Sequence, residues 1–144
     1  MKNTSAARRP SIHLIDSEAD ALTNLAYSVE ERLPQVSELL IGEIARATIH
    51  TADRLPRDVV AMLSTVEFND AASGTTRIVQ LVYPREADIS AGRISILTPV
   101  GAGLIGLREG QSIVWPDREG NERKLTIVKV TQNGLSPATA TARA

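Results

Sequence analysis

The sequence contains a match to the glycine-rich pattern G-x-G-x-x-G, formed by Gly101, Gly103 and Gly106. In dinucleotide-binding proteins this pattern holds a pyrophosphate at the start of a long helix within a strand-helix-strand unit. Here only residues 100–107 can be helical before a turn at Gly110, whereas a crossover helix needs about ten residues or more. The pattern therefore predicts a short, closely packed helix, and the alternative is a backbone turn that binds an anion.

Thr98 and Pro99 predict where this short helix begins. Threonine is a favoured N-cap residue, and the fixed φ of proline suits the first helical position. Gly106 helps to end the helix, because glycine adopts the backbone angles of a helix end at little cost.

Other reactive side chains form weaker patterns. His13 and His50 lie on different elements and have no acidic neighbours at metal-ligand spacing, so both are expected to be exposed or structural. Glu30 and Glu31 form a carboxylate pair that could hold a divalent ion, although two solvated acids at a helix end are the favoured interpretation. The sequence has no cysteine, no G-x-S-x-G elbow and no S-x-x-K. It therefore predicts no catalytic residue, no bound metal and no cofactor.

Composition excludes several classes of function. The 144 residues carry 16 Lys and Arg against 17 Asp and Glu, so no basic field attracts a phosphate backbone. Strong direct binding to nucleic acid is therefore not expected. No apolar run approaches the roughly 18 residues of a membrane span, and no apolar segment follows the basic start. We expect a cytoplasmic protein that does not bind membranes.

The first half of the chain has helical periodicity. Apolar residues recur at three and four positions over residues 22–33, Pro34 interrupts the pattern, and the spacing resumes over residues 36–47. Proline suits the first turn of a second helix. Two antiparallel helices of about 16 residues each, or about 25 Å long, are predicted.

From Pro56 onward, alternating apolar and β-branched residues predict at least five strands, near residues 66–68, 78–82, 93–97, 111–115 and 122–130. The fold class is therefore α+β, with a helical hairpin followed by an antiparallel sheet and one short helix. The predicted segments are an N-terminal extension (1–14), a short helical hairpin (15–52), a strand-rich domain (53–131) and a disordered tail (132–144).

Charge is distributed unevenly along the chain. Residues 15–50 contain seven acids and two bases, a net charge of −5, whereas residues 54–144 contain eleven bases and nine acids. An acidic helical arm suggests a basic protein or channel as its surroundings, and the alternative is an ordinary solvated face.

The order of these elements resembles the Gre family of transcription elongation factors over residues 12–130. The segment TPVGAGLIGLREGQSI, which begins at Thr98, is similar to the family pattern Ser-Pro-x-Gly-x-Ala-Leu-x-Gly-x-x-x-Gly-Asp. Thr98 stands where serine is usual and Gly103 where alanine is usual. The segments LPRDVVAM, from Leu55, and LVYP, from Leu81, are closer to the branch called regulator of nucleoside diphosphate kinase.

This resemblance implies an FKBP-like C-terminal domain that docks on RNA polymerase near the rim of the secondary channel, with the helical arm pointing inward. It implies no enzyme activity of the chain itself. The residues that it places at the polymerase-facing turn are Thr98, Pro99, Val100 and Leu104.

The resemblance also predicts what the arm does. Gre cleavage factors carry an Asp and a Glu three residues apart at the arm tip, where they hold a metal in the polymerase active site. Here the tip reads VEERLPQV and carries the adjacent acids Glu30 and Glu31. We therefore expect competition with Gre factors for the polymerase and no transcript cleavage.

Two alternative functions remain open at this point. An FKBP-like fold suggests a peptidyl-prolyl isomerase or chaperone, which typically needs an aromatic-lined cleft. Phe68, Tyr83 and Trp115 are the only aromatic residues of the strand-rich domain and are more typical of packing. The other alternative is a regulatory domain that binds an anion or metabolite at residues 98–106.

Overall fold

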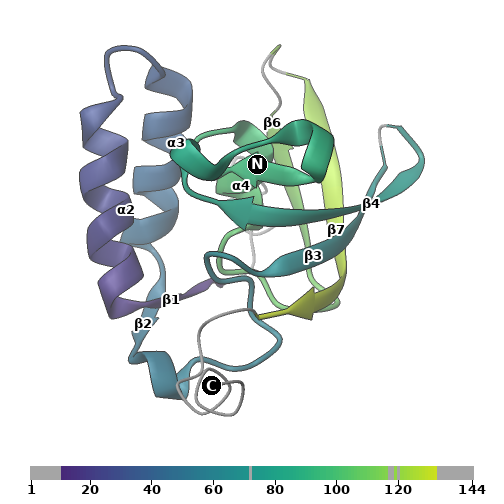
Figure 1. The fold of residues 1–144 in the computed structure, drawn as a ribbon, viewed down its shortest axis with the longest axis horizontal. Coiled ribbons are helices and arrows are strands. Elements are labelled where there is room, and N and C mark those ends of the chain that lie inside the picture. Colours follow the sequence, from purple (N-terminus) through teal and green to yellow (C-terminus); the bar gives the residue numbers. More distant parts are fainter. Residues whose placement is uncertain (1–10, 72, 117–118, 120, 133–144) are drawn as a thin grey trace, which may run out of the picture.

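The computed structural model describes residues 11–71, 73–116, 119 and 121–132. Two helices stand beside a five-stranded sheet, which gives the predicted α+β class (Figure 1). The predicted disordered tail from residue 133 onward, and residues 1–10 of the N-terminal extension, lie outside the described residues. Within those ranges, no helix has the length and apolar character needed to cross a membrane.

Helices α2 (Asp16–Ser28) and α3 (Pro34–Ala45) lie side by side and are joined by residues 29–33; together they form what we call the arm (Figure 1). Pro34 begins α3, as its position predicts. The hydroxyl of Ser37 donates a buried hydrogen bond of 2.9 Å to the carbonyl of Ala26 and so links the two helices. At 13 and 12 residues the helices are shorter than predicted, and the arm is about 20 Å long.

Residues that flank the two helices form a second sheet that the sequence did not predict. Strands β1 (His13–Ile15) and β2 (Thr48–His50) pair in parallel, and the arm is the connection between them. A parallel pair needs a long crossover connection, which the two helices supply. Strands of three residues are too short to show alternation in the sequence.

The large sheet contains the five predicted strands in the order β5-β4-β3-β7-β6. Their bounds are β3 (Thr65–Asp70), β4 (Thr75–Val82), β5 (Arg93–Ser95), β6 (Ser112–Pro116) and β7 (Glu122–Thr131). The prediction of a purely antiparallel sheet is wrong at one edge, where β5 pairs in parallel with β4. The connection between them contains two short 3-10 turns, η2 (Pro84–Glu86) and η3 (Ile89–Ala91), and is long enough to return the chain to the same end of the sheet.

One continuous apolar core joins the arm to the sheet. Leu22 and Leu40 from the arm belong to the same buried cluster as Phe68 and Trp115 from the sheet. A smaller cluster places Ile15 of β1 against residues 55–61, just after the 3-10 turn η1 (Ala52–Arg54). The arm is therefore packed along one side of the sheet, and its position depends on the core that it shares with the sheet.

Candidate functional site

The glycine-rich segment forms helix α4 (Pro99–Leu104), which is only six residues long. Thr98 is its N-cap, and the side-chain oxygen accepts a hydrogen bond of 3.0 Å from the amide of Gly101. The same hydroxyl donates to the carbonyl of Ser95 at 2.8 Å. The predicted cap and start are confirmed. A helix of this length cannot form the strand-helix-strand unit of a dinucleotide site.

Close packing explains each glycine of the G-x-G-x-x-G pattern. A Cβ atom on Gly101 would lie 2.3 Å from the carbonyl oxygen of Ser95, and one on Gly103 would lie 3.0 Å from the ring of Trp115. Gly106 has a φ of +83°, which favours glycine, and a Cβ there would lie 2.8 Å from the side chain of Ile12. The pattern therefore reflects close approach of α4 to its neighbours.

A cavity of about 360 Å³ opens beside the start of α4. Three of the four residues that the sequence assigned to a polymerase-facing turn, Thr98, Pro99 and Val100, line it. Leu104 does not, because its side chain is fully buried in the core. The other lining residues are Arg77, Ala87, Ile89, Arg93, Ile94, Ser95, Glu119 and Arg123. We call this hollow the α4 cleft.

The α4 cleft combines apolar walls with three arginines. Arg123 forms an ion pair with the buried carboxylate of Asp70. Arg93 lies 3.6 Å from Asp88, whose pKa is lowered chiefly by a hydrogen bond from Ser90. These ion pairs hold two of the guanidinium groups beside the cleft. Glu119 adds an acidic side chain to the lining.

A third guanidinium group of the α4 cleft belongs to Arg77, which lies over Phe68. Its carbon is 5.8 Å from the ring centroid, within the range of a cation-π contact. Ile89, in the connection between β4 and β5, contributes an apolar side chain that is 80% exposed. The cleft therefore presents both cationic and apolar side chains to the solvent.

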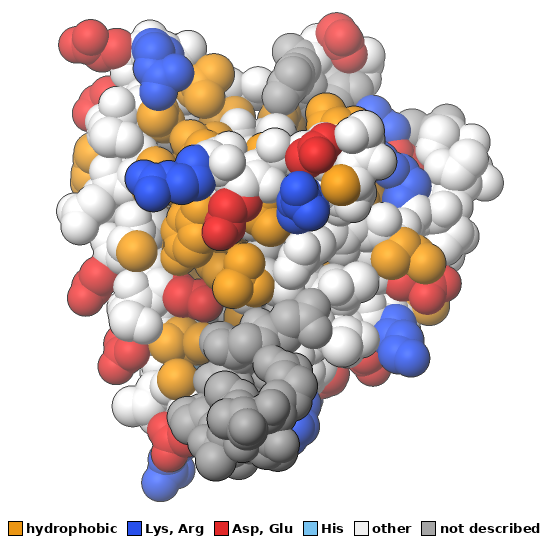
Figure 2. Space-filling model, viewed as in Figure 1, with side chains coloured by type: hydrophobic (Ala, Val, Ile, Leu, Met, Phe, Trp, Pro, Cys, Tyr) orange, Lys and Arg blue, Asp and Glu red, His pale blue; other side chains and the backbone are white. Residues whose placement is uncertain are grey.

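At the arm tip, Glu30 and Glu31 lie in the turn between α2 and α3, and both are exposed. No group of three or more potential metal ligands occurs among the residues that the structure describes. Acidic side chains follow the edge of the molecule formed by the arm, and an apolar area lies between the arm and the sheet (Figure 2). Not all seven arm acids contribute to this charge, because Glu43 is buried in an ion pair of 2.7 Å with Arg46.

The arm base contains an ionisable group, Glu18, whose position the sequence did not predict. The carboxylate of Glu18 accepts a hydrogen bond of 3.2 Å from the amide of Met62. Burial raises the pKa of Glu18 to about 7, against the opposing effect of that hydrogen bond. This residue therefore joins α2 to the segment that leads into β3.

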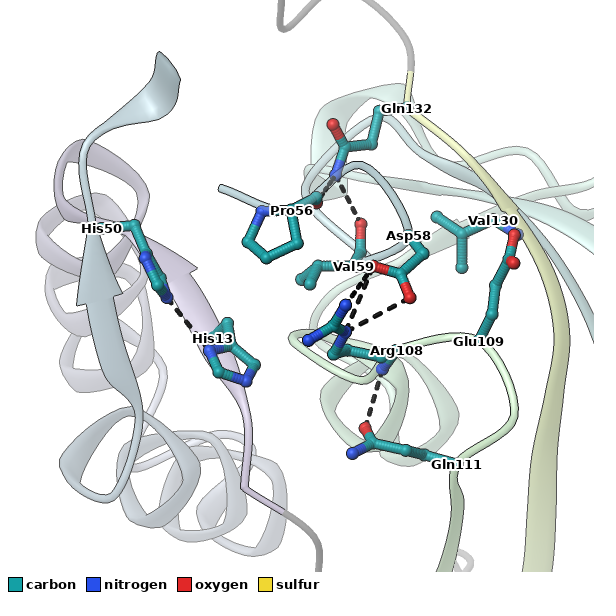
Figure 3. Close-up of polar contacts among 10 residues, drawn as sticks. All are labelled: His13, His50, Pro56, Asp58, Val59, Arg108, Glu109, Gln111, Val130 and Gln132. Carbon is teal, nitrogen blue, oxygen red and sulfur yellow. Dashed lines mark hydrogen bonds and ion pairs between the residues drawn. The ribbon is translucent and has the colours of Figure 1, made fainter. Parts of the chain in front are cut away.

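The structure also brings together His13 and His50, which the sequence placed on separate elements. Nδ1 of His13 lies 3.0 Å from Nε2 of His50 (Figure 3). Burial lowers the pKa of His13, and the nearby His50 and Arg108 lower it further. A separation of 37 residues hides this pair from any local pattern, and only the parallel pairing of β1 and β2 reveals it.

Beside the histidines, polar contacts tie the segment after β2 to the turn before β6 and to the residue that follows β7 (Figure 3). Asp58 forms an ion pair of 3.0 Å with Arg108. The amide group of Gln132 donates to the carbonyls of Pro56 and Val59, each at 2.8 Å. These contacts hold the arm base against the sheet.

A sequence profile for the family described as "Transcription elongation factor, GreA/GreB, C-term" matches residues 55–132, which include α4 and the α4 cleft. The chain belongs to the GreA/GreB family. The resemblance found in the sequence is therefore confirmed, and the family assignment supports a role like that of a transcription elongation factor.

Two relatives match a larger share of this chain than the profile does, and their matches include residues of the arm. The regulator of nucleoside diphosphate kinase of Escherichia coli strain K12 is 36% identical over 122 residues, which cover 85% of this chain and 90% of that protein. The transcription elongation factor GreA of Azorhizobium caulinodans is 35% identical over 130 residues, covering 85% of this chain and 82% of that protein. These GreA/GreB relatives are named as regulators or transcription factors and not as enzymes.

This chain is also similar in fold to a solved structure of the same family. The transcription elongation factor GreA/GreB from Nitrosomonas europaea has a TM-score of 0.67 and 36% identity, and the match covers 85% of this chain and 99% of that one. The arrangement of helices and mixed sheets described above is consistent with the GreA/GreB fold.

Proposed function

We propose that this chain is a non-enzymatic transcription regulator that binds RNA polymerase near the secondary channel and modulates elongation. The observation that carries the proposal is the α4 cleft, in which Thr98, Pro99 and Val100 line an open hollow inside the region that matches the family. The glycines of α4 are held by packing, so the α4 wall of the cleft has a fixed position before any partner arrives.

The chemistry of the α4 cleft suggests how the polymerase is held. Ile89, Ile94 and Val100 provide apolar contact area, which supplies most of the binding free energy in protein interfaces. Arg77, which lies over Phe68, can pair with a carboxylate of the partner segment. Leu104 contributes from below, as a core residue that supports α4.

The arm is proposed to act by occupying space. Its helices are about 20 Å long, and its tip carries Glu30 and Glu31 as adjacent exposed acids. Adjacent acids do not reproduce the Asp-x-x-Glu spacing that the resemblance associates with transcript cleavage. We therefore infer that the chain competes with Gre factors and does not itself stimulate cleavage.

Aromatic positions favour this proposal over prolyl isomerisation. The resemblance suggests an FKBP-like domain, which we retain as part of the proposal. However, Phe68 and Trp115 are almost fully buried. Neither side chain is available to line an open proline-binding cleft. We expect no acceleration in a prolyl-peptide isomerase assay.

Binding and competition test the proposed function together. Purified chain should be retained by immobilised core RNA polymerase, and excess chain should displace a GreA factor from it. With stalled elongation complexes, the chain alone should produce no cleavage, and its titration against a cleavage factor should suppress that factor's activity. Magnesium-dependent cleavage by the chain alone would contradict the occupancy model, and failure to displace GreA would contradict the shared docking site.

A further inference from the structure

The only two histidines of the chain meet at the arm base. His13 lies on β1, directly before α2, and His50 lies on β2, shortly after α3. In the parallel register His13 is opposite Thr48, and His50 is opposite Ile15. Paired residues in a sheet share a face, and alternate residues of a strand return to it, so both imidazoles lie on one face of this two-stranded ribbon.

The distance between the rings suits two ligands of one metal ion. Nδ1 of His13 and Nε2 of His50 are 3.0 Å apart, and the ring planes are tilted by 42°. Two imidazole nitrogens on a tetrahedral zinc ion, each about 2.05 Å from the metal, are about 3.4 Å apart. If the distance between these two nitrogen atoms increased by only a few tenths of an ångström, a metal ion could take the place of the hydrogen-bonded proton.

The surroundings of the pair accommodate such an ion. Both side chains are partly exposed, which leaves access from solvent. The charged groups that face His13 are Arg108 and Asp58; Arg108 lowers the pKa of His13, Asp58 raises it by less, and the two form an ion pair of 3.0 Å with each other. Among the described residues no third His, Cys, Asp or Glu completes a cluster, so water fills the remaining coordination positions.

We propose that His13 and His50 form a two-ligand site for a late divalent transition metal ion such as Zn²⁺ or Cu²⁺. Imidazole ligands favour these ions, and Cu²⁺ binds a given nitrogen site more tightly than Zn²⁺. Mg²⁺ and Ca²⁺ prefer oxygen ligands and do not bind there. This site is separate from the α4 cleft and does not depend on polymerase binding.

A bound ion would cross-link both ends of the arm. His13 is also held by its backbone, because its amide donates to the carbonyl of Gly106 at 3.1 Å. The ion would therefore add a constraint between β1 and β2 at a point already fixed to the sheet. Local unfolding of the arm base should become less frequent when the metal is present.

The test uses the full chain without an affinity tag, treated first with a chelator. Addition of Zn²⁺ or Cu²⁺ should raise the Tm, whereas Mg²⁺ should not. The electron paramagnetic resonance spectrum of the Cu²⁺ form should show coupling to two nitrogens at one ion per chain. His50→Gln should weaken Cu²⁺ binding by at least about tenfold, which is about 1.4 kcal/mol. Ile49→Gln, at an exposed residue on the other face of the ribbon, should bind as the unchanged chain does.

His13→Gln provides an independent variant in case His50→Gln does not fold. An unchanged Tm with either ion, together with no two-nitrogen signal, would mean a hydrogen-bonded histidine pair only and would overturn the proposal. Retention of full Cu²⁺ affinity in a folded variant that lacks either histidine would mean an adventitious ion only, with the same consequence.

Discussion

The α4 segment and the arm tip are both short, but they are built in opposite ways. Around α4, Gly101 and Gly103 face backbone or ring atoms at distances that leave no room for a Cβ. At the tip, Glu30 and Glu31 are exposed. The first region can hold a fixed shape for a partner, whereas the second can present charge without fixing a shape. We therefore propose that α4 serves in docking and the tip in modulation.

Two matched glycine substitutions should give the largest difference in stability. Gly101→Ala places a Cβ 2.3 Å from the carbonyl oxygen of Ser95. Overpacking of this kind should lower the free energy of unfolding by about 3 kcal/mol. Gly42→Ala, at an exposed position of α3, meets nothing within 4 Å and should raise the free energy of unfolding by up to about 1 kcal/mol, because alanine favours helix. Urea denaturation would measure both.

Equal stabilities of Gly101→Ala and Gly42→Ala would contradict the distinction between a packed α4 and an open arm surface. Far-ultraviolet circular dichroism serves as the control, since both variants should retain the native secondary structure at low urea.

Glu18 is an arm acid that breaks the comparison, because it is partly buried at the arm base, where it accepts a hydrogen bond from the amide of Met62. The pKa of Glu18 is about 7 in the folded chain, compared with an ordinary value of 4.5. Folding therefore favours the protonated form of the side chain. The stability that this shift contributes is present below pH 4.5 and is lost as pH rises through about 7. Glu18→Gln can still accept the amide hydrogen bond of Met62 and should be more stable than the unchanged chain at pH 8, by about 1–3 kcal/mol.

Thermal unfolding of both proteins from pH 5 to pH 8 would check this expectation. The difference between them should grow with pH across that window, and Glu38→Gln, at an exposed arm acid, should show no such trend. A constant difference would show that the burial of Glu18 is not coupled to its ionisation.

The smallest effect on stability is expected at the tip. The double variant Glu30→Gln and Glu31→Gln should change the free energy of unfolding by less than about 0.5 kcal/mol. Polymerase binding should persist but become less sensitive to salt, and part of the effect on transcription should be lost. The salt dependence of binding and the transcription output, measured beside Glu38→Gln, would show whether the tip acids act specifically. Unchanged values in both assays would make them ordinary solvated residues.

Local chemistry explains which features the sequence predicted. Thr98 and Pro99 specify the start of α4 within a few residues, and Pro34 does the same for α3. The five strands of the large sheet follow from alternation in the same way. These elements are determined by residues that are neighbours in the sequence, and the sequence alone therefore predicts them.

Features that depend on tertiary pairing were not visible. The contact between His13 and His50 exists because β1 and β2 pair in parallel across the whole arm. The three arginines of the α4 cleft come from β4, β5 and β7, whose order in the sheet is not the order in the sequence. The burial of Leu104 likewise follows from packing that its position in the pattern does not specify.

The most direct test of the central proposal compares two Val→Asp variants in their affinity for core RNA polymerase. Val100→Asp places a charge in the α4 cleft at an early helix position that tolerates an acid, whereas Val128→Asp changes a solvent-exposed valine on β7 outside the cleft. With folding verified by Tm, Val100→Asp should weaken binding by about tenfold or more, equivalent to about 1.4 kcal/mol, and Val128→Asp should bind as the unchanged chain does. Equal affinity of the unchanged chain and a folded Val100→Asp would show that the polymerase does not dock on this cleft.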